Sequence, residues 1–472
     1  MTSIAVKPVT CPDCGAEFQA PLLHSVNVTA TPELRARLFS GDINRVACPS
    51  CPAAFNAVAP LLYDDPERAF GVWLTPPLDE EDYNAFVRRM EEDQGTYLGD
   101  AAVTSGWGTF RSTIRALERT RDWFGPPSDG SPPDVGQATV DFVYRRLKVD
   151  DWWAVRGGRG YAWWGGSLAQ YVWAEPCFDD AGVLLSRVHV RTDVLTEFAD
   201  TDAQIAALQT PMRGATVSGL ARAPDDPTRL QLAASACVHT DTQAWLQELL
   251  AWVAPMQAAE AEVLASELAG QAGLGPAWSV HPSAGPRAGA DEMLSLPDAV
   301  IRPLGQGPSL WRGPEMESLV PLLQRPPCAL VTGDEDGLTA EYPFGTRTSL
   351  LQMNTEEPHP WLGAGLATRL TLPRGGVLDD GREALCLNER ELSSLTRAPF
   401  LGSWCAGPLG LTHTAFLPNA LHKAGALTNL AMYAVQRARW TATEVYQEVW
   451  DERVRPAVAV ENLFGFGPSD DT

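Results

Sequence analysis

Two short cysteine motifs near the N-terminus constrain this chain more than any other feature. The first is CPDC, with Cys11 and Cys14, and the second is CPSC, with Cys48 and Cys51. Each motif can present two thiolates to one ion, and four thiolates close the tetrahedral sphere of a structural Zn²⁺. A catalytic zinc normally keeps one coordination position open for water or substrate. We therefore predict a structural zinc ion bound by Cys11, Cys14, Cys48 and Cys51.

The 33 residues between the two motifs exceed what a minimal zinc ribbon needs, so a folded element is expected there. Thr31 suits a helix N-cap, Pro32 the first helical position, and Gly41 a left-handed stop. Leu34 and Leu38 would share one face of this helix. Alternating apolar runs follow each motif, which predicts the order strand, cysteine turn, strand, short helix, cysteine turn, strand.

Two neighbours of the cysteine motifs raise separate questions. Gly15 follows the first motif, where a turn favours positive φ, whereas Pro52 follows the second and cannot adopt it. The second turn should therefore differ in detail from the first. His24 could replace a cysteine as a ligand, but its apolar neighbours favour a partly buried strand residue.

These motifs together resemble the bacterial CpXC domain. The resemblance covers CPDCGAEF, the intervening SVNVTATPELRARLFSGDIN, the second CPSC and the trailing PLLYDDPERAF. It implies zinc binding by the four cysteines and no particular reaction. We place this CpXC-like, zinc-ribbon-like domain at residues 1–125, where helices over 78–99 and 110–124 would complete it. The segment GPPSDGSPP then predicts a linker at 126–133.

Composition limits the compartment and the partners. A net charge of −23 argues against a broad nucleic-acid interface. Nine cysteines, an odd number, do not suggest a disulfide framework, and thiolate ligands favour a reducing compartment. The start MTSIAVKPVTC lacks the pattern of a signal peptide, and no window approaches 18 consecutive apolar residues. We expect a cytoplasmic bacterial protein that does not enter a membrane.

From residue 134 onward one order of elements appears twice, about 180 residues apart. The first copy contains a helix over 135–147, tryptophan-rich strands over 152–173, and a strand over 184–194. A short helix, two more strands and a long helix over 242–268 follow. The second copy begins with a helix over 315–323 and closes with one over 427–450. The connector over 271–313 is rich in Gly and Pro, and we expect it to lie along a domain surface with Trp278 as an anchor.

This order, α-β-β-β-α-β-β-α, resembles the YbjN family and the class I chaperones of type III secretion. The resemblance implies an α+β chain with two tandem antiparallel-sheet domains, at residues 134–270 and 314–460, and a disordered tail at 461–472. It also implies binding of protein partners without catalysis. Because the chaperones usually dimerise, the chain would form either a homodimer or an internal pseudo-dimer.

The tryptophan-rich hairpin over 152–173 has two interpretations. Its aromatic faces could stack on a ligand at the surface, or they could pack in the core against the long helix that carries Trp245 and Trp252. The glycines of this hairpin match no phosphate-binding pattern and are expected in turns.

Two cysteine–histidine pairs are the candidates for catalysis. Cys237 with His239 and Asp241 lies at one strand end, and Cys405 and His413 lie on strands expected to be neighbours. Apolar neighbours favour inert, buried thiols at both places. We therefore expect a non-catalytic, zinc-containing adaptor or chaperone-like protein that binds another protein. The alternative is an enzyme of unknown reaction with a pocket between the tandem domains.

Overall fold

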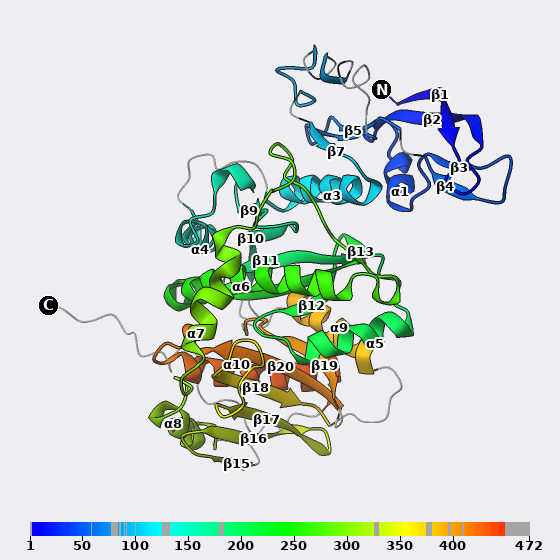
Figure 1. Cartoon of the computed structure of the whole chain (residues 1–472). Helices are drawn as coiled ribbons and strands as arrows, with labels where there is room; N and C mark the ends of the chain where they lie inside the picture. Colours follow the sequence, from blue (N-terminus) through cyan, green and yellow to red (C-terminus); the bar gives the residue numbers. More distant parts are fainter. Residues whose placement is uncertain are drawn as a thin grey trace.

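Helices and sheets are mixed along the chain, as the sequence predicts. The computed structural model describes residues 2–57, 59–76, 84, 86–88, 90, 92–99, 101–124, 133–178, 184–324, 330–373, 380–394, 398–407 and 410–448. Three sheets of five or more strands follow one another along these residues (Figure 1). Apart from Pro133, the predicted linker over 126–133 lies outside the described residues, and so does the predicted tail.

The first sheet belongs to the N-terminal unit, residues 2–124, and has the strand order β1-β2-β5-β6-β7. A separate two-stranded ribbon pairs β3 with β4. The helices α1 and α3 pack on this sheet through Leu34, Leu38, Phe110 and Ile114. The bounds are β1 Ser3–Thr10, β2 Glu17–Asn27, α1 Glu33–Phe39, β3 Arg45–Ala47, β4 Ala54–Asn56, β5 Leu61–Asp65, β6 Phe70–Leu74, β7 Ala102–Thr104 and α3 Trp107–Phe124.

The helix predicted between the cysteine motifs is present as α1. Leu34 and Leu38 are both buried, and Gly41 adopts φ +81° just beyond the helix end. The helix begins slightly later than predicted, with Pro32 in the capping position. Much of the helix predicted over 78–99 lies outside the described residues, but the described residues from 84 to 92 are mostly helical.

The second sheet forms the middle unit, residues 133–268, with the strand order β12-β13-β11-β10-β9-β8. The helices α4 and α6 cover one of its faces and share a large apolar core with it. Asp134 caps α4 by accepting a hydrogen bond from the backbone N–H of Gln137. The bounds are α4 Val135–Arg146, β8 Ala154–Arg156, β9 Gly160–Trp163, β10 Gln170–Phe178, β11 Leu184–Thr196, α5 Asp202–Arg213, β12 Gly219–Ala223, β13 Asp226–Val238 and α6 Thr240–Leu268.

The third sheet forms the C-terminal unit, residues 314–448, with the strand order β19-β20-β18-β17-β16-β15. A π-helical turn over Thr441–Val445 follows α10, which is therefore shorter than the predicted helix over 427–450. The bounds are α8 Pro314–Leu323, β15 Leu330–Gly333, β16 Gly337–Phe344, β17 Arg347–Asn354, β18 Gly365–Thr371, α9 Asp380–Ser393, β19 Ser403–Gly407, β20 Gly410–Pro418 and α10 Ala426–Trp440.

The middle and C-terminal units have the same element order and the same strand order. Each has a helix, four strands, a second helix, two strands and a closing helix, and the strands of both sheets pair antiparallel. The prediction of three strands before the second helix was wrong by one. The prediction missed the strand β8 in the first copy, because β8 has only three residues.

Three packing expectations need correction or qualification. On α6, Leu249 and Met256 are buried as predicted, but Val263 is 50% exposed. In the connector, Trp278 is 53% exposed and is no anchor, whereas Trp311 is buried. The connector is also more structured than expected, because a short strand, β14 at Gly275–Pro276, pairs with β11. Further along, helical turns occupy Glu292–Ser295, Pro297–Ile301 and Arg302–Leu304 (α7).

The middle and C-terminal units meet through equivalent positions. Phe400, three residues before β19, exchanges backbone hydrogen bonds with Ser235 of β13, at N···O distances of 3.2 and 2.8 Å. Thr216, three residues before β12, accepts a hydrogen bond from the backbone N–H of Phe416 of β20 at 3.1 Å. The helices α5 and α9 also contact each other here (Figure 1). Contacts that repeat with the two units exchanged indicate an approximate twofold relation between them.

Candidate metal centre

Two hairpin turns bring the four cysteines together. Cys11 and Cys14 lie in the turn between β1 and β2, and Cys48 and Cys51 lie in the turn between β3 and β4. The four Sγ atoms all lie within 4.8 Å of one another. This is the only group of three or more potential metal-ligating side chains found within the described part of the chain. His24 does not belong to it.

The two turns share one backbone pattern. The N–H of Cys11 donates to the carbonyl of Ala16 at 2.9 Å, and the N–H of Cys48 donates to Ala53 at the same distance. In the first turn Gly15 adopts φ +73° and its N–H donates to Cys11 at 2.9 Å. Pro52 has no N–H to make the matching bond, so the second turn differs as predicted.

The sulfur positions fit a tetrahedral zinc ion. Zn–S bonds of about 2.3 Å place the sulfurs of a regular tetrahedron about 3.8 Å apart. The Sγ atoms of Cys11 and Cys51 are 3.7 Å apart, and those of Cys14 and Cys48 are 3.6 Å apart. Burial raises the pKa of Cys48, but the backbone N–H of Ser50 and the neighbouring thiols lower it to about 7. The backbone N–H of Ala53 lowers the pKa of Cys51, but burial and the neighbouring thiols raise it to about 12. The pKa shifts within the cluster therefore differ in sign, and only the lowered one favours the thiolate, which is the metal-binding form.

Of the two candidate cysteine–histidine pairs, the structure separates Cys405 from His413. Cys405 pairs with Thr412 across the strands and His413 pairs with Trp404, so the two side chains point to opposite faces of the sheet. Burial also raises the pKa of Cys405 to about 11. His239 caps α6 through Nδ1, which also lies 3.3 Å from a carboxylate oxygen of Asp241. Cys237 interacts with Cys177 and Arg187, and these contacts lower its pKa to about 6 against the effect of burial.

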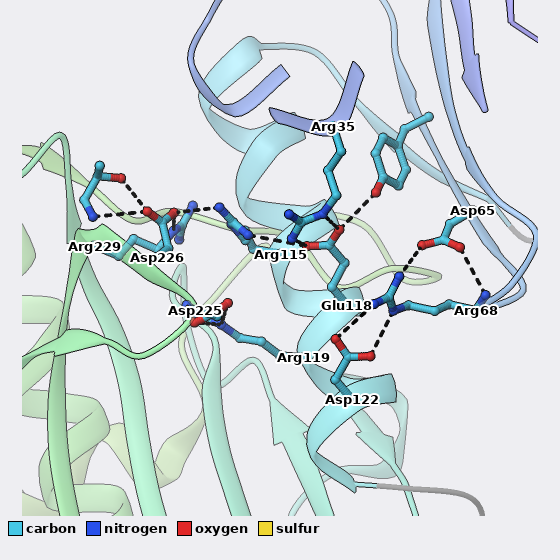
Figure 2. Close-up of polar contacts among 12 residues, drawn as sticks. Arg35, Asp65, Arg68, Arg115, Glu118, Arg119, Asp122, Asp225, Asp226 and Arg229 are labelled. Atoms are coloured by element: carbon cyan, nitrogen blue, oxygen red, sulfur yellow. Dashed lines mark hydrogen bonds and ion pairs between the residues drawn. The ribbon is translucent and has the colours of Figure 1, made fainter. Parts of the chain in front are cut away.

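A second polar centre, which the sequence did not suggest, joins the N-terminal and middle units along α3 (Figure 2). Glu118 of α3 is 3% exposed and forms two hydrogen bonds with Arg35 of α1, at 2.6 and 2.7 Å. The hydroxyl of Tyr63 donates to the same carboxylate at 2.9 Å. These contacts hold α3 to its own unit.

The next residue of α3 reaches the other unit. Arg119 is 1% exposed, and its Nη1 lies 2.6 Å from both carboxylate oxygens of Asp193 in β11. It also contacts Asp225 at 3.0 Å. Arg115, one turn earlier, lies 3.2 Å from Asp226. A buried guanidinium needs such partners, because an unpaired buried charge is costly.

The tryptophan-rich hairpin packs on both of its faces. Trp163 lies in the core beneath α4 and α6, which fits the core interpretation. Trp164, Tyr171 and Trp173 lie on the opposite side with Ala116 and Phe124 of α3. The indole of Trp123 stacks on that of Trp173 with a centroid distance of 4.5 Å. Within the hairpin Trp152 is 70% exposed, but Trp163, Trp164, Tyr171 and Trp173 are buried. Most of the aromatic surface of the hairpin is therefore used inside the protein.

Alternating charges along α3 were the available signal for this interface. Arg115, Glu118, Arg119 and Asp122 recur at three- and four-residue spacing, which sequence reasoning would assign to a solvated helix surface. The partners of Arg115 and Arg119 lie on β11, in the turn after β12 and at the start of β13. They are 74 to 111 positions away, so sequence proximity could not reveal them.

No helix within the described ranges is both long and apolar enough to cross a membrane. No curated protein and no solved structure matches this chain. A model described as CpXC protein matches residues 9–116, which include all four clustered cysteines and end within α3. That segment, rather than the whole chain, is therefore similar to the CpXC family.

Proposed function

We propose that this is a non-catalytic adaptor or chaperone-like protein that binds another protein through its tandem α+β units. In this proposal the four cysteines hold one structural Zn²⁺ in a zinc-ribbon-like N-terminal unit. The closed set of four thiolates supports a structural ion, because it leaves no ligand position for a substrate. Thiolate ligands also support a reducing, cytoplasmic compartment.

The observation that carries the proposal is the paired contact between the middle and C-terminal units. The Ser235–Phe400 and Thr216–Phe416 hydrogen bonds occupy equivalent positions in two sheets of the same strand order. This arrangement supports an internal pseudo-dimer of two domains that resemble the YbjN and class I secretion-chaperone fold. Fold likeness alone assigns no activity, so protein binding has to be tested directly.

Partner capture with the full chain tests this function. A truncation before Asp134 is unsuitable, because it would expose Tyr171 and Trp173, which α3 covers. The lysines are Lys7, Lys148 and Lys423, against 59 acidic residues, so a carboxylate-reactive crosslinker gives the better map. We expect a stoichiometric protein partner crosslinked to residues 133–448.

The matched variant is Cys48→Ser in the same full chain. If the zinc is structural and binding lies in the tandem units, the variant should form the same crosslinks to residues 133–448 when it folds. Crosslinks confined to the N-terminal unit would contradict the assignment of binding to the tandem units. A full chain that captures no stoichiometric protein would contradict the adaptor function itself.

The alternative function, an enzyme of unknown reaction, is favoured by one feature, a pocket between α6 and the segment that enters α10. The charge of −23 supports neither DNA nor RNA as the partner.

A further inference from the structure

Two cysteines of the middle unit share one face of its sheet, away from the zinc centre. Cys237 of β13 pairs directly with Arg187 of β11, and on the other side Arg187 pairs with Glu175 of β10. Cys177 lies two positions beyond Glu175 on β10, so its side chain points to the same face. The alternate residues of these strands fill the core beneath α4 and α6, on the opposite face. The two thiols therefore flank the strand that carries Arg187.

Arg187 is a buried cation that forms no ion pair with a carboxylate among the described residues. It is 5% exposed, and its guanidinium donates to the backbone carbonyls of Leu392, at 3.1 Å, and of Ser394. The carboxylate of Glu175 contacts His189 instead, at 2.9 Å. A buried guanidinium is costly without an opposite charge, and the two carbonyls are neutral. The environment of Arg187 therefore favours an anion on a neighbouring side chain.

The thiol of Cys237 can supply that anion. Contacts with Cys177 and Arg187 lower the pKa of Cys237, whereas the contact with Cys237 raises the pKa of Cys177. At neutral pH the pair therefore shares one proton and carries one negative charge. The thiolate is the nucleophilic form of cysteine, and electropositive, partly exposed surroundings favour it. Cys237 itself is 8% exposed, but Cys177 beside it is half-buried, which gives a small reagent access to the pair.

We propose that Cys237 is a site of oxidation by hydrogen peroxide, held as a thiolate by Arg187 and by the thiol of Cys177. The Cys237 sulfur attacks one peroxide oxygen, an S–O bond forms as the O–O bond breaks, and hydroxide leaves. The sulfur is oxidised to a sulfenic acid and the peroxide is reduced. The reaction removes the negative charge beside Arg187, which holds the end of α9 of the C-terminal unit. This oxidation site is additional to the proposed adaptor function.

Peptide mass spectrometry of the peroxide-treated full chain tests the proposal, because it follows each cysteine separately. At pH 6 we expect Cys237 to be oxidised about tenfold faster than the exposed Cys386, because its larger thiolate fraction outweighs the weaker nucleophilicity of a low-pKa thiolate. Dithiothreitol should restore the thiol, since it reduces a sulfenic acid and also a disulfide formed from it with Cys177. The proposal is overturned if Cys237 stays reduced or reacts no faster than Cys386.

The pH profile of Cys237 alkylation by iodoacetamide tests the role of Arg187. In the wild type the rate should level off above pH 7, and Arg187→Met should raise the midpoint by about one pH unit or more. Arg187→Lys keeps a positive charge and should restore part of the shift. Arg213→Met is the matched control, because Arg213 of α5 also donates to a carbonyl of the C-terminal unit, that of Ala406 at 3.1 Å. An unchanged midpoint in Arg187→Met, or an equal shift in Arg213→Met, would contradict this role.

Discussion

At the scale of single residues, His189 makes stability depend on pH. Its ring is 3% exposed, stacks on Trp173 and contacts Glu175 at 2.9 Å. Burial lowers its pKa to about 4, against the opposing effect of Glu175. An unfolded histidine titrates near 6.5, so the unfolded chain binds more protons below that pH and folding stability falls as the pH falls.

We predict that His189→Phe reduces this acid sensitivity. Between pH 7.5 and 5.0 the wild-type histidine contributes a loss of about 2 kcal/mol, which the variant should not show. Urea unfolding of both proteins at the two pH values measures the difference. An equal loss in wild type and variant would mean that His189 titrates normally in the folded protein.

Arg119 provides a second prediction at this scale. Arg119→Met leaves Asp193 and Asp225 without their shared guanidinium, although Arg229 remains 3.3 Å from Asp193. We expect a stability loss of about 3 kcal/mol, as for other broken buried pairs. Arg121→Met, at an exposed position of the same helix, is the control. Similar unfolding midpoints for the two variants would count against the buried ion pair.

The residue scale also shows what the sequence could and could not predict. The four cysteines were identifiable because two ligands of each pair are three positions apart and the chemistry of thiolates is specific. Arg119 was not, because an arginine on a helix is ordinarily solvated and its partner Asp193 is 74 positions away. Local motifs could be predicted, whereas long-range charge pairs could not.

At the scale of elements, the closeness of α3 to β9 depends on Gly160. A Cβ at this position would lie 2.5 Å from the Cβ of Trp173 and 2.7 Å from Phe124 of α3. We predict that Gly160→Ala destabilises the protein by about 1–3 kcal/mol, as overpacking does, and loosens α3. Hydrogen exchange of the amides in α3 measures the second effect.

Gly108 in the same helix gives a control of opposite sign. A Cβ there meets no atom within 4 Å, and the residue is exposed. Gly108→Ala should therefore stabilise the protein by about 0.5–1 kcal/mol through helix propensity alone. If both substitutions shifted stability in the same direction, the close approach of α3 to β9 would be in doubt.

Element order was largely readable from periodicity, but packing was not. The strand expected over 184–194 is present as β11, and the helix over 135–147 is present as α4. The three-residue β8 is too short for a periodic signal. The tryptophan-rich hairpin was ambiguous because aromatic side chains suit both cores and surfaces, and only the position of α3 decides which role they have.

At the scale of the whole molecule, the paired units predict a monomer. If the middle and C-terminal units occupy each other's dimer surface, a second chain has no equivalent surface to bind. We expect light scattering after size exclusion to give the chain mass of 51.1 kDa across a wide range of protein concentrations. A stable dimer would show that the internal pairing leaves an interface open.

The zinc content of the full chain tests the four-cysteine centre most directly. Reduced protein, purified without added metal, would be analysed for zinc per chain beside Cys48→Ser and the exposed-cysteine control Cys386→Ser. A structural zinc held by the four cysteines predicts one zinc in the wild type and in Cys386→Ser, and a loss of bound zinc in Cys48→Ser. A folded wild-type chain without zinc, or the same zinc content in Cys48→Ser, would contradict the four-cysteine centre.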